Sequence, residues 1–388
     1  MKNNKINVIL LAGAVLAATA CQETIPFEDV IYFSGTEDSP VVTMYVDNGP
    51  ASRGIAVTSS CKMTEDVIVD LEINADAVAS YNAAHGTSYR MLPDGSYDLS
   101  ASSLKIERGS NVSVPVSFEI TSLDDFDDGA QYCVPVSITG TSNGMKVLEA
   151  SRTVYIMIDQ IITTKGVNLG GNWYISFPSM KNHPDYTDLD ACTMEIRVLV
   201  NKWPDRDHSI STVFGVEENF LLRFGDVKVD NDQLQMSGRG LSAATNSHFS
   251  TGRWYHIAVV DDGVTETIYV NGEADGSAST AGSAAINLAD SRGLFIGSSL
   301  GSRLLNGCVS EARIWNRALS PIELKNNQCY VSPDAEGLLG YWRLDELNEN
   351  GNFTDLTGRG HDGVPTNKSG RPDSVTEWTG EIKCPVID

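Results

Sequence analysis

Short segments with alternating apolar and polar residues occupy most of this chain. In its first part they include DVIVDLEIN, SVPVSFEI and RTVYIMID. Successive side chains of a strand point to opposite faces, so this period of two predicts strands that are buried on one side. Roughly eight such segments between residues 30 and 160, separated by Gly, Asn and Asp, predict an Ig-like β-sandwich. The exception is residues 77–84, whose composition predicts a helix that ends at Gly86.

From residue 165 to residue 388 the same alternation predicts a second β-domain. Its segments include CTMEIRVLVN, CVSEARIWNR and GLLGYWRLDE. The stretch VVDDGVTETIYVNGE predicts a hairpin that turns near Gly263, because glycine tolerates the positive φ of such turns. Only SPIELKN predicts a helix, with Ser320 as the N-cap and Glu323 as the acid of a capping box. The connection between the domains is too short for a flexible linker, so we expect the domains to lie close together.

The N-terminus has the pattern of a lipoprotein signal peptide over residues 1–20. Lys2 and Lys5 precede an apolar run, and small residues lead up to Cys21. We expect cleavage before Cys21 and acylation at that residue, since two or more lipid chains anchor a protein stably. Residues 21–29 would form the tether, and the membrane would be contacted through the lipid anchor only. A plain secretory signal, cut at the same place, is the alternative.

The residue after the cysteine bears on location. Gln22 stands there instead of the Asp that retains enteric lipoproteins at the inner membrane. We therefore expect an outer-membrane protein whose domains face the cell surface.

The charge balance of the chain excludes one class of partner. The chain has 51 acidic and 28 basic residues and a formal net charge of −23 at pH 7. Such an acidic surface repels phosphate backbones, so we expect no nucleic acid partner. No CxxC pair occurs among the seven cysteines, which excludes the usual thiolate metal spacing. Cys329 and Cys384 flank the last segment and could form a disulfide.

Four segments of the second domain carry a family resemblance. They are WYHIAVVDDGVTETIYVNGE, FIGSSLGSRLLNGCVSEARIWNRALSPIEL, GLLGYWRLDE and DLTGRGHDG. This part of the chain resembles the laminin-G-like branch of the concanavalin A-like lectin/glucanase superfamily. The resemblance implies a jelly-roll of two antiparallel sheets, with a concave face that commonly binds glycans.

The first domain also resembles a known family. The residues that carry this likeness are IYFSG, YNAAHGTSYRMLPDGSYDL and YCVPVSI. They resemble the domain of unknown function that precedes glycan-handling modules, including family 18 endo-glycosidases, in surface lipoproteins of Gram-negative bacteria. This resemblance implies N-glycans as the first candidate ligand.

No catalytic motif supports an enzyme. Glycoside hydrolysis ordinarily needs two carboxylates, and retaining glucanases of the concanavalin A-like fold carry them as Glu-x-Asp-x-x-Glu on one strand. No such run occurs between residues 165 and 388, and the acidic cluster at residues 345–349 fits a solvated loop. We therefore expect no catalytic residues. A hydrolase whose carboxylates converge from separate loops stays open as an alternative.

Two loop-rich stretches of the second domain offer aromatic side chains for carbohydrate. The C–H faces of sugars pack on aromatic rings, while polar side chains orient the hydroxyls. The stretch NKWPDRDHS places Trp203 beside Asp205 and Arg206. We expect these three residues to bind carbohydrate, unless Trp203 folds over the edge of the sandwich. The stretch GGNWYISFPSMKNHPDYTDLD adds three further candidates, which are Trp173, Tyr174 and Tyr186.

Other conspicuous residues are assigned to structure. The strand tryptophans are predicted to lie in the core, and they are Trp254, Trp315 and Trp342. His256 is predicted to be buried and bonded to a backbone carbonyl. Glu311 and Arg313 alternate with apolar neighbours, so we expect them to pair on a solvated outer face.

The Gly-rich turn DLTGRGHDG is a candidate for structural calcium, which members of the superfamily often hold through backbone carbonyls and an aspartate. Asp355 and Asp362 would supply the hard oxygen ligands that calcium prefers. Alternatively, aspartates at such a turn hydrogen-bond their own backbone. No other cofactor is expected.

These features together predict a non-catalytic, cell-surface glycan-binding lipoprotein of a starch-utilisation-type uptake system. Its ligand would be an oligosaccharide or a glycoprotein glycan. Its partners would be an outer-membrane transporter and a glycosidase. A protein-binding adhesin or structural surface module is the alternative.

Overall fold

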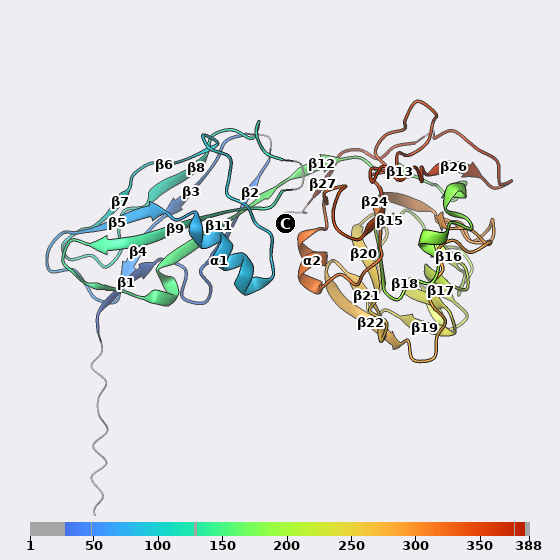
Figure 1. Ribbon diagram of the computed structural model, residues 1–388, viewed down its shortest axis with the longest axis horizontal. Coiled ribbons are helices and arrows are strands. Elements are labelled where there is room, and N and C mark those ends of the chain that lie inside the picture. Colours follow the sequence, from blue (N-terminus) through green and yellow to red (C-terminus); the bar gives the residue numbers. More distant parts are fainter. Residues whose placement is uncertain (1–27, 48, 128–129, 376, 385–388) are drawn as a thin grey trace, which may run out of the picture.

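The computed structural model describes residues 28–47, 49–127, 130–375 and 377–384. The predicted signal peptide at residues 1–20, the lipidation site Cys21 and most of the 21–29 tether lie outside these residues. Two β-rich domains lie side by side along the long axis of the molecule, and β12 (Ile162–Thr164) lies between them (Figure 1). None of the helices in the described part of the chain is long and apolar enough to span a bilayer.

The N-terminal domain packs one five-stranded sheet against two three-stranded sheets. In spatial order, the five-stranded sheet contains β2 (Val41–Val46), β11 (Thr153–Gln160), β9 (Tyr132–Thr141), β5 (Val67–Ile73) and β7 (Ser103–Ile106). One three-stranded sheet contains β10 (Lys146–Val147), β1 (Val30–Phe33) and β4 (Val57–Ser59). The other contains β3 (Ala51–Ile55), β8 (Val116–Ile120) and β6 (Tyr97–Leu99).

The alternation in the sequence decides which face of each strand is buried. In β5, for example, Val67, Val69 and Leu71 are buried, whereas Ile68, Asp70 and Glu72 between them are exposed. The buried side chains of all three sheets meet in one hydrophobic cluster. The predicted N-terminal β-sandwich is confirmed.

The C-terminal domain consists of two large sheets. The first, here called the helix-side sheet, contains β13 (Val167–Asn168), β24 (Gly307–Trp315), β15 (Cys192–Val200), β20 (Trp254–Asp261), β21 (Thr265–Val270) and β22 (Glu273–Ser279), with β25 (Leu338–Trp342) also paired to β24. The second, the far sheet, contains β19 (Leu241–Ala244), β18 (Val229–Gly238), β17 (Phe220–Asp226), β16 (Ser211–Val216), β23 (Phe295–Ile296), β14 (Trp173–Ser176) and β26 (Val364–Asn367).

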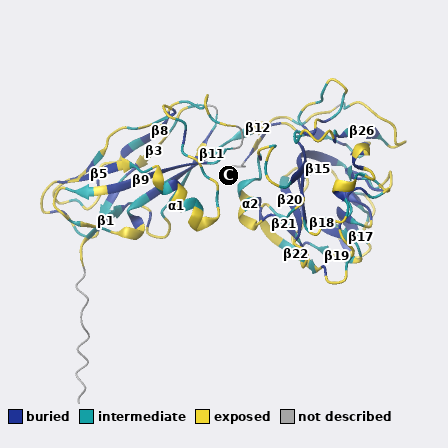
Figure 2. Ribbon diagram, viewed as in Figure 1, coloured by how far each residue is buried: buried dark blue, intermediate teal, exposed yellow. Residues whose placement is uncertain are grey.

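The facing surfaces of these two sheets form the core of the C-terminal domain. Side chains such as Ile196, Phe214 and Ile257 belong to one cluster drawn from both sheets. Figure 2 shows the buried strands inside the domain and the exposed residues mainly in its loops. The predicted all-β jelly-roll is confirmed.

Three local predictions are also confirmed. β20 and β21 form the predicted hairpin, with Gly263 at a φ of 83°. The first helix, α1 (Asp76–His85), ends at Gly86, which adopts the left-handed conformation at a φ of 66°. The second helix, α2 (Pro321–Asn326), begins with a complete capping box, in which Ser320 Oγ accepts from the Glu323 N–H and the Glu323 carboxylate accepts from the Ser320 N–H.

The C-terminal strand returns to the junction between the domains. This strand, β27 (Ile382–Cys384), pairs antiparallel with β12. Cys384 forms a disulfide with Cys329, which follows α2, so the predicted bridge is confirmed. Lys383 Nζ lies 2.5 Å from Asp47 Oδ2 of the N-terminal domain. The end of the chain therefore ties β12, the N-terminal domain and the α2 region together.

Candidate functional site

A cleft with two lobes lies between the domains, where α1 faces α2 (Figure 1). One lobe has a volume of about 340 Å³ and is lined by four tyrosines, so we call it the tyrosine lobe. The other, the polar lobe, has a volume of about 510 Å³. Gln131 and Asn326 line both lobes, and Gln131 Nε2 donates a hydrogen bond of 3.1 Å to the Asn326 carbonyl. This contact between the domains marks the boundary between the lobes.

The floor of the tyrosine lobe is the outer face of β2 and β11. Alternate residues of these strands, such as Met44 and Ile158, point into the sandwich core. Tyr45 and Asp159 therefore lie on the opposite face, where they are direct partners in the parallel pairing of the two strands. Tyr45 is 46% exposed, so its ring is accessible to a ligand.

The segment that ends α1 and follows it supplies an aromatic wall. The ring of Tyr81 lies 4.8 Å from that of Tyr155 and 6.0 Å from that of Tyr89. Asn82 fixes this arrangement, because its side chain donates to the Tyr89 carbonyl and accepts from the Tyr89 N–H. Burial raises the pKa of Tyr89 to about 12, with smaller contributions from Asp159 and Tyr81. The Tyr89 hydroxyl is therefore protonated at neutral pH and can donate a hydrogen bond.

Asp159 is the acidic side chain of this lobe. Burial raises its pKa above the ordinary value of an aspartate. No other described residue forms a hydrogen bond or an ion pair with its carboxyl group. The group is therefore available to accept hydrogen bonds from a ligand's hydroxyls.

The C-terminal domain closes the tyrosine lobe with the end of α2 and the residues that follow. Lys325, Gln328 and Tyr330 line this side. Lys325 Nζ is already engaged by Glu273 Oε1 at 2.5 Å. Gln328 makes no side-chain hydrogen bond to any other described residue. This wall therefore offers a ligand the Gln328 amide, while the charge of Lys325 is already balanced by Glu273.

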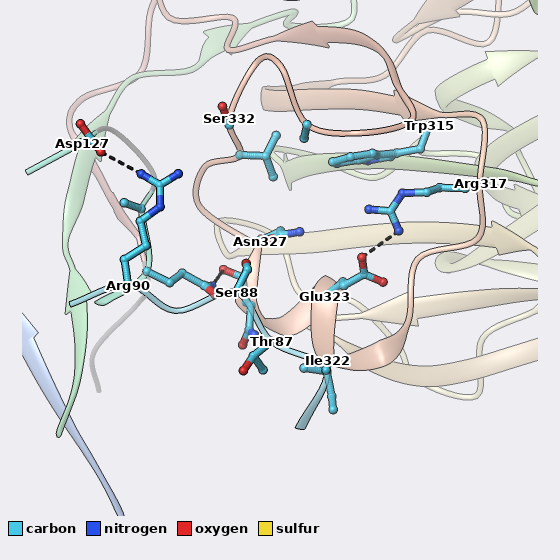
Figure 3. A pocket seen from close by; sticks show the side chains of 16 residues that line it. Thr87, Ser88, Arg90, Asp127, Trp315, Arg317, Ile322, Glu323, Asn327 and Ser332 are labelled. Carbon is cyan, nitrogen blue, oxygen red and sulfur yellow. Dashed lines mark hydrogen bonds and ion pairs between the residues drawn. The ribbon is translucent and has the colours of Figure 1, made fainter. Parts of the chain in front are cut away.

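Two ion pairs on opposite sides define the polar lobe (Figure 3). On the N-terminal domain, Arg90 Nη1 lies 2.8 Å from Asp127 Oδ2, and on the C-terminal domain Arg317 Nη1 lies 2.7 Å from Glu323 Oε1. Burial alone would raise the pKa of Glu323, but hydrogen bonds from the Ser320 N–H and Arg317 outweigh it and lower this pKa. Each acid of the polar lobe is thus matched by an arginine.

Beneath the polar lobe, Trp315 joins the cleft to buried charges of the helix-side sheet. It is only 1% exposed, and its Nε1 donates to Glu195 Oε1 at 2.7 Å. His256 Nε2 lies 3.0 Å from the other oxygen of Glu195. The predicted backbone partner for His256 is therefore wrong. The alternation in the sequence predicts whether a strand residue is buried. It does not predict which charged side chain of the neighbouring strand lies next to that residue.

Arg313 connects the same network to the wall of the polar lobe. Its Nη2 donates to Glu311 Oε2 at 2.9 Å, and its Nη1 donates to the Asn327 carbonyl at 2.5 Å. Glu311 and Arg313 are both fully buried, so the prediction of a solvated pair is wrong. The reason is that α2 and the segment after it cover this face, and Leu319, Leu324 and Val331 pack there with Trp315.

Three of the predicted carbohydrate-binding residues are buried in the jelly-roll. Trp173 belongs to the core between the sheets, and Tyr174 packs edge-on against Phe295 at 5.4 Å. Tyr186 is also a core residue, and its hydroxyl donates to the Leu339 carbonyl at 3.2 Å. These rings cannot stack on a sugar without leaving their packing. Their prediction as ligand contacts is corrected here, because the aromatic content of a loop says nothing about its burial.

The loop with Trp203 lies on the jelly-roll and does not line the cleft. Trp203 is half-buried, and its ring packs edge-on against the core residue Phe224 at 5.1 Å. Asp205 and Arg206 are exposed, and Asp205 pairs with Lys202 at 2.7 Å. This is the arrangement in which the tryptophan folds over the edge of the sandwich. Among the strand tryptophans, Trp315 and Trp342 are core residues as predicted, whereas Trp254 is half-buried.

The two aspartates proposed for calcium hold their own turn. Asp355 Oδ1 accepts from the Thr357 N–H and hydroxyl, and Asp355 Oδ2 accepts from the His361 N–H. Asp362 Oδ1 accepts from the Asp355 N–H and Oδ2 from Asn348 Nδ2. All four oxygens thus have donors from the protein, which fits the alternative reading of this turn. Calcium binding here stays a prediction.

A second acidic cluster was not predicted from the sequence. Asp230, Asp232 and His248 offer ligand atoms within 4.8 Å of one another near the ends of far-sheet strands. His248 Nδ1 already lies 2.9 Å from Asp232 Oδ1, and the cluster is largely exposed. Its geometry alone does not indicate a bound ion.

The cleft residues were not predicted, although part of the signal was visible. Tyr81 and Tyr89 lie within YNAAHGTSYRMLPDGSYDL, a segment noted for its family likeness and for a predicted helix but not as a binding site. Tyr45 and Asp159 lie on strands 114 residues apart, and only their parallel pairing brings them together. The opposite wall of the tyrosine lobe belongs to the C-terminal domain.

Two family models match separate parts of the chain. Residues 169–325 match a laminin G model described as the concanavalin A-like lectin/glucanases superfamily. Residues 27–145 match the model of a family of N-terminal domains. Both resemblances seen in the sequence are thus confirmed for these parts of the chain. No curated protein matches the chain.

The chain is also similar to solved structures. A Bacteroides ovatus protein, provisionally described as carbohydrate binding, is 25% identical, covers 91% of this chain and 97% of its own, and has a TM-score of 0.56. EndoBT-3987 of Bacteroides thetaiotamicron, solved with a Man5GlcNAc product, is 15% identical over 34% of this chain and 30% of its own, with a TM-score of 0.29. A Trypanosoma rangeli sialidase is 16% identical over 58% of this chain and 42% of its own, with a TM-score of 0.32. The last two likenesses do not bear on function.

Proposed function

We propose that this protein is a non-catalytic glycan-binding surface lipoprotein that holds an oligosaccharide in the cleft between its two domains. The observation that carries the proposal is the composition of the tyrosine lobe. There the exposed ring of Tyr45, the carboxyl group of Asp159 and side-chain amides without partners among the described residues come together from both domains. The likeness over 91% of the chain to a protein provisionally described as carbohydrate binding supports the same class of ligand.

The chemistry of the lobe suits a sugar. The apolar C–H face of a pyranose packs on an aromatic ring, and its hydroxyls need both donors and acceptors. Tyr45 offers the exposed ring. Asp159 accepts hydrogen bonds, while Gln160 and Gln328 both donate and accept. A flat ring with polar groups around it is the arrangement that such a ligand requires.

The acids of the cleft favour binding over hydrolysis. Hydrolysis ordinarily needs two carboxyl groups, about 5 Å apart for retention and somewhat more for inversion. Asp159 is the only acidic side chain among the described residues that line the tyrosine lobe. In the polar lobe, Asp127 and Glu323 are each engaged by an arginine. No described pair in the cleft therefore combines a free acid with a free base.

The finer parts of the proposal rest on the sequence. The basic start, apolar run and small residues before Cys21 support lipidation, and Gln22 supports the outer membrane. We propose host N-glycans as the first ligand to test, and a transporter and a glycosidase as partners of the starch-utilisation type. Protease treatment of intact cells tests display, because an untouched protein would place the domains in the periplasm.

A glycan array followed by calorimetry tests the function on residues 22–388. We expect at least one oligosaccharide to bind. Tyr45→Ala should weaken its affinity about tenfold, since a lost aromatic contact is worth about 1.5 kcal/mol. Tyr45→Phe should retain most of the affinity, because the ring remains.

Four results would contradict this proposal. An array without a bound glycan would remove the function itself, and release of product from a bound glycan would show an enzyme. Weakening by Trp203→Ala but not by Tyr45→Ala would place the glycan at the jelly-roll loop. Binding to a protein after its complete deglycosylation would instead support the adhesin alternative.

A further inference from the structure

We infer that the cleft selects a neutral oligosaccharide over an anionic one, and that one neutral chain passes from the tyrosine lobe across the Gln131–Asn326 contact into the polar lobe. The inference rests on the proposed function of the cleft and names the class of its ligand. Two observations carry it, namely the pairing of the charged side chains and the open state of the amides.

Every cation among the described residues that line the cleft already has an acidic partner. Arg90 is paired with Asp127 and Arg317 with Glu323. Lys325 is paired with Glu273. Recognition of a carboxylate or sulfate on a sugar relies on charge-assisted hydrogen bonds from a free arginine or lysine. An anionic glycan would therefore meet only cations whose charge an acidic side chain already balances.

The carboxyl group of Asp159 also disfavours an anionic ligand. Asp159 is the one charged lining group without a partner among the described residues. A sialylated, sulfated or uronic acid chain would bring a like charge towards it, in a protein that already carries a formal net charge of −23. Hydroxyl groups can satisfy the Asp159 carboxyl without bringing any charge into the cleft.

The open groups of the cleft are amides. The side chains of Gln160 and Gln328 in the tyrosine lobe, and of Asn327 in the polar lobe, form no hydrogen bond to another described residue. Asn326 has the same open amide at the boundary. Each amide carries both donors and an acceptor, which matches hydroxyls that must also donate and accept. The groups left unpaired by the protein are thus the ones that a neutral polyhydroxylated chain can use.

The amides of Gln131 and Asn327 lie where a ligand that extends from one lobe to the other would pass. Gln131 uses Nε2 to bond the Asn326 carbonyl, which leaves Gln131 Oε1 as an acceptor where the lobes meet. A chain that packs on Tyr45 and continues past this point meets Asn327 in the polar lobe. One ligand would then contact the N-terminal domain through the tyrosines and the C-terminal domain through the residues after α2.

Matched pairs of glycans test the class of ligand. The array on residues 22–388 should contain asialo and sialylated biantennary N-glycans, and neutral glucans beside polyglucuronate. We expect the best-bound members to be uncharged, and each anionic counterpart to bind at least about tenfold more weakly. Equal or tighter binding of the anionic member of any pair would overturn this inference while leaving glycan binding intact. An array without any bound glycan would overturn the proposed function itself.

A length series with variants in each lobe tests the path. For the neutral glycan that binds best, Tyr45→Ala and Asn327→Ala should each weaken the longest chain, about tenfold and about threefold. Asn111→Ala, at an exposed asparagine outside the cleft, is the matched control and should leave the affinity unchanged. If chains of every length lose affinity only with Tyr45→Ala, the ligand occupies the tyrosine lobe alone and the spanning path is wrong.

Discussion

Arg313 shows how much charge the molecule buries beneath its cleft. Its guanidinium lies 2.9 Å from Glu311, 3.8 Å from Glu195 and 5.1 Å from the ring of Tyr341. Glu195 in turn bonds Trp315, so the residues share their partners. In such a network the loss of one member leaves another charge buried without compensation.

Removal of the Arg313 guanidinium should lower the stability of the folded protein strongly. We expect Arg313→Ala to lower the free energy of unfolding by about 3–5 kcal/mol. Lys105→Ala, which breaks an exposed pair with Asp66, should lower it far less, because water and salt screen exposed charges. Denaturant titration of both variants makes the comparison, and similar losses would show that burial of the network contributes little.

Glu266 should give the stability a particular pH dependence. Burial, the largest cause, raises its pKa to about 7 even though Arg239 opposes the shift. Below about pH 4.5 the folded and unfolded states both carry the proton. Between pH 4.5 and 7 the unfolded state loses it first, so this group makes the folded state less stable as pH rises, and the penalty is constant above 7.

Glu266→Gln removes that titration. Relative to the wild type, the variant's free energy of unfolding should therefore increase between pH 4.5 and 7 and change no further above it. Loss of the contact with Arg239 changes the variant's free energy of unfolding by the same amount at every pH, so it does not affect the pH dependence. Denaturant titrations at several pH values measure the difference, and a difference that stays constant would mean that Glu266 has its ordinary pKa.

At the scale of elements, α2 and the strand pair β12/β27 hold the C-terminal wall of the cleft. The capping box fixes where α2 begins. The disulfide fixes where the chain goes after α2, because Cys329 is bonded to Cys384 on β27. The residues between α2 and β25 line both lobes, so these local features determine the shape of the site.

Loss of the disulfide should have a large effect. It spans a sequence separation of 55, for which constraint of the unfolded chain is worth about 4 kcal/mol. We expect the double variant Cys329→Ser/Cys384→Ser to lose about this much stability and to be insensitive to reductant. The wild type should lose a similar amount when reduced, and a wild type unaffected by reductant would contradict the expectation.

The elements also show what can be predicted from sequence. Strand positions, the hairpin at Gly263 and the capping box at Ser320 follow from local patterns, because each depends on neighbouring residues only. Whether the outer face of a strand is solvated depends on what covers it. The pattern around Glu311 is that of a half-exposed strand, yet a segment beginning only a few residues later in the chain buries it. The tyrosine lobe was missed for the same reason, since its walls come from separate strands and two domains.

At the scale of the whole molecule, a ligand that touches both walls should couple the domains. At a concentration of 100 times Kd, binding should stabilise the folded protein by about 2.7 kcal/mol. Hydrogen exchange should slow both in β2 and β11 and in the residues around Asn327. Slowing confined to one domain would show that the ligand is held there alone.

The return of β27 to β12 has a mechanical consequence. When the two domains are pulled apart, the tension does not run through a single strand. Part of it passes from β12 across the ladder to β27, and from there through the disulfide to the residues after α2. Lys383 adds a direct link to Asp47. The junction is therefore built to bear load, with a covalent cross-link in parallel with the backbone at the point where the two halves would otherwise peel apart.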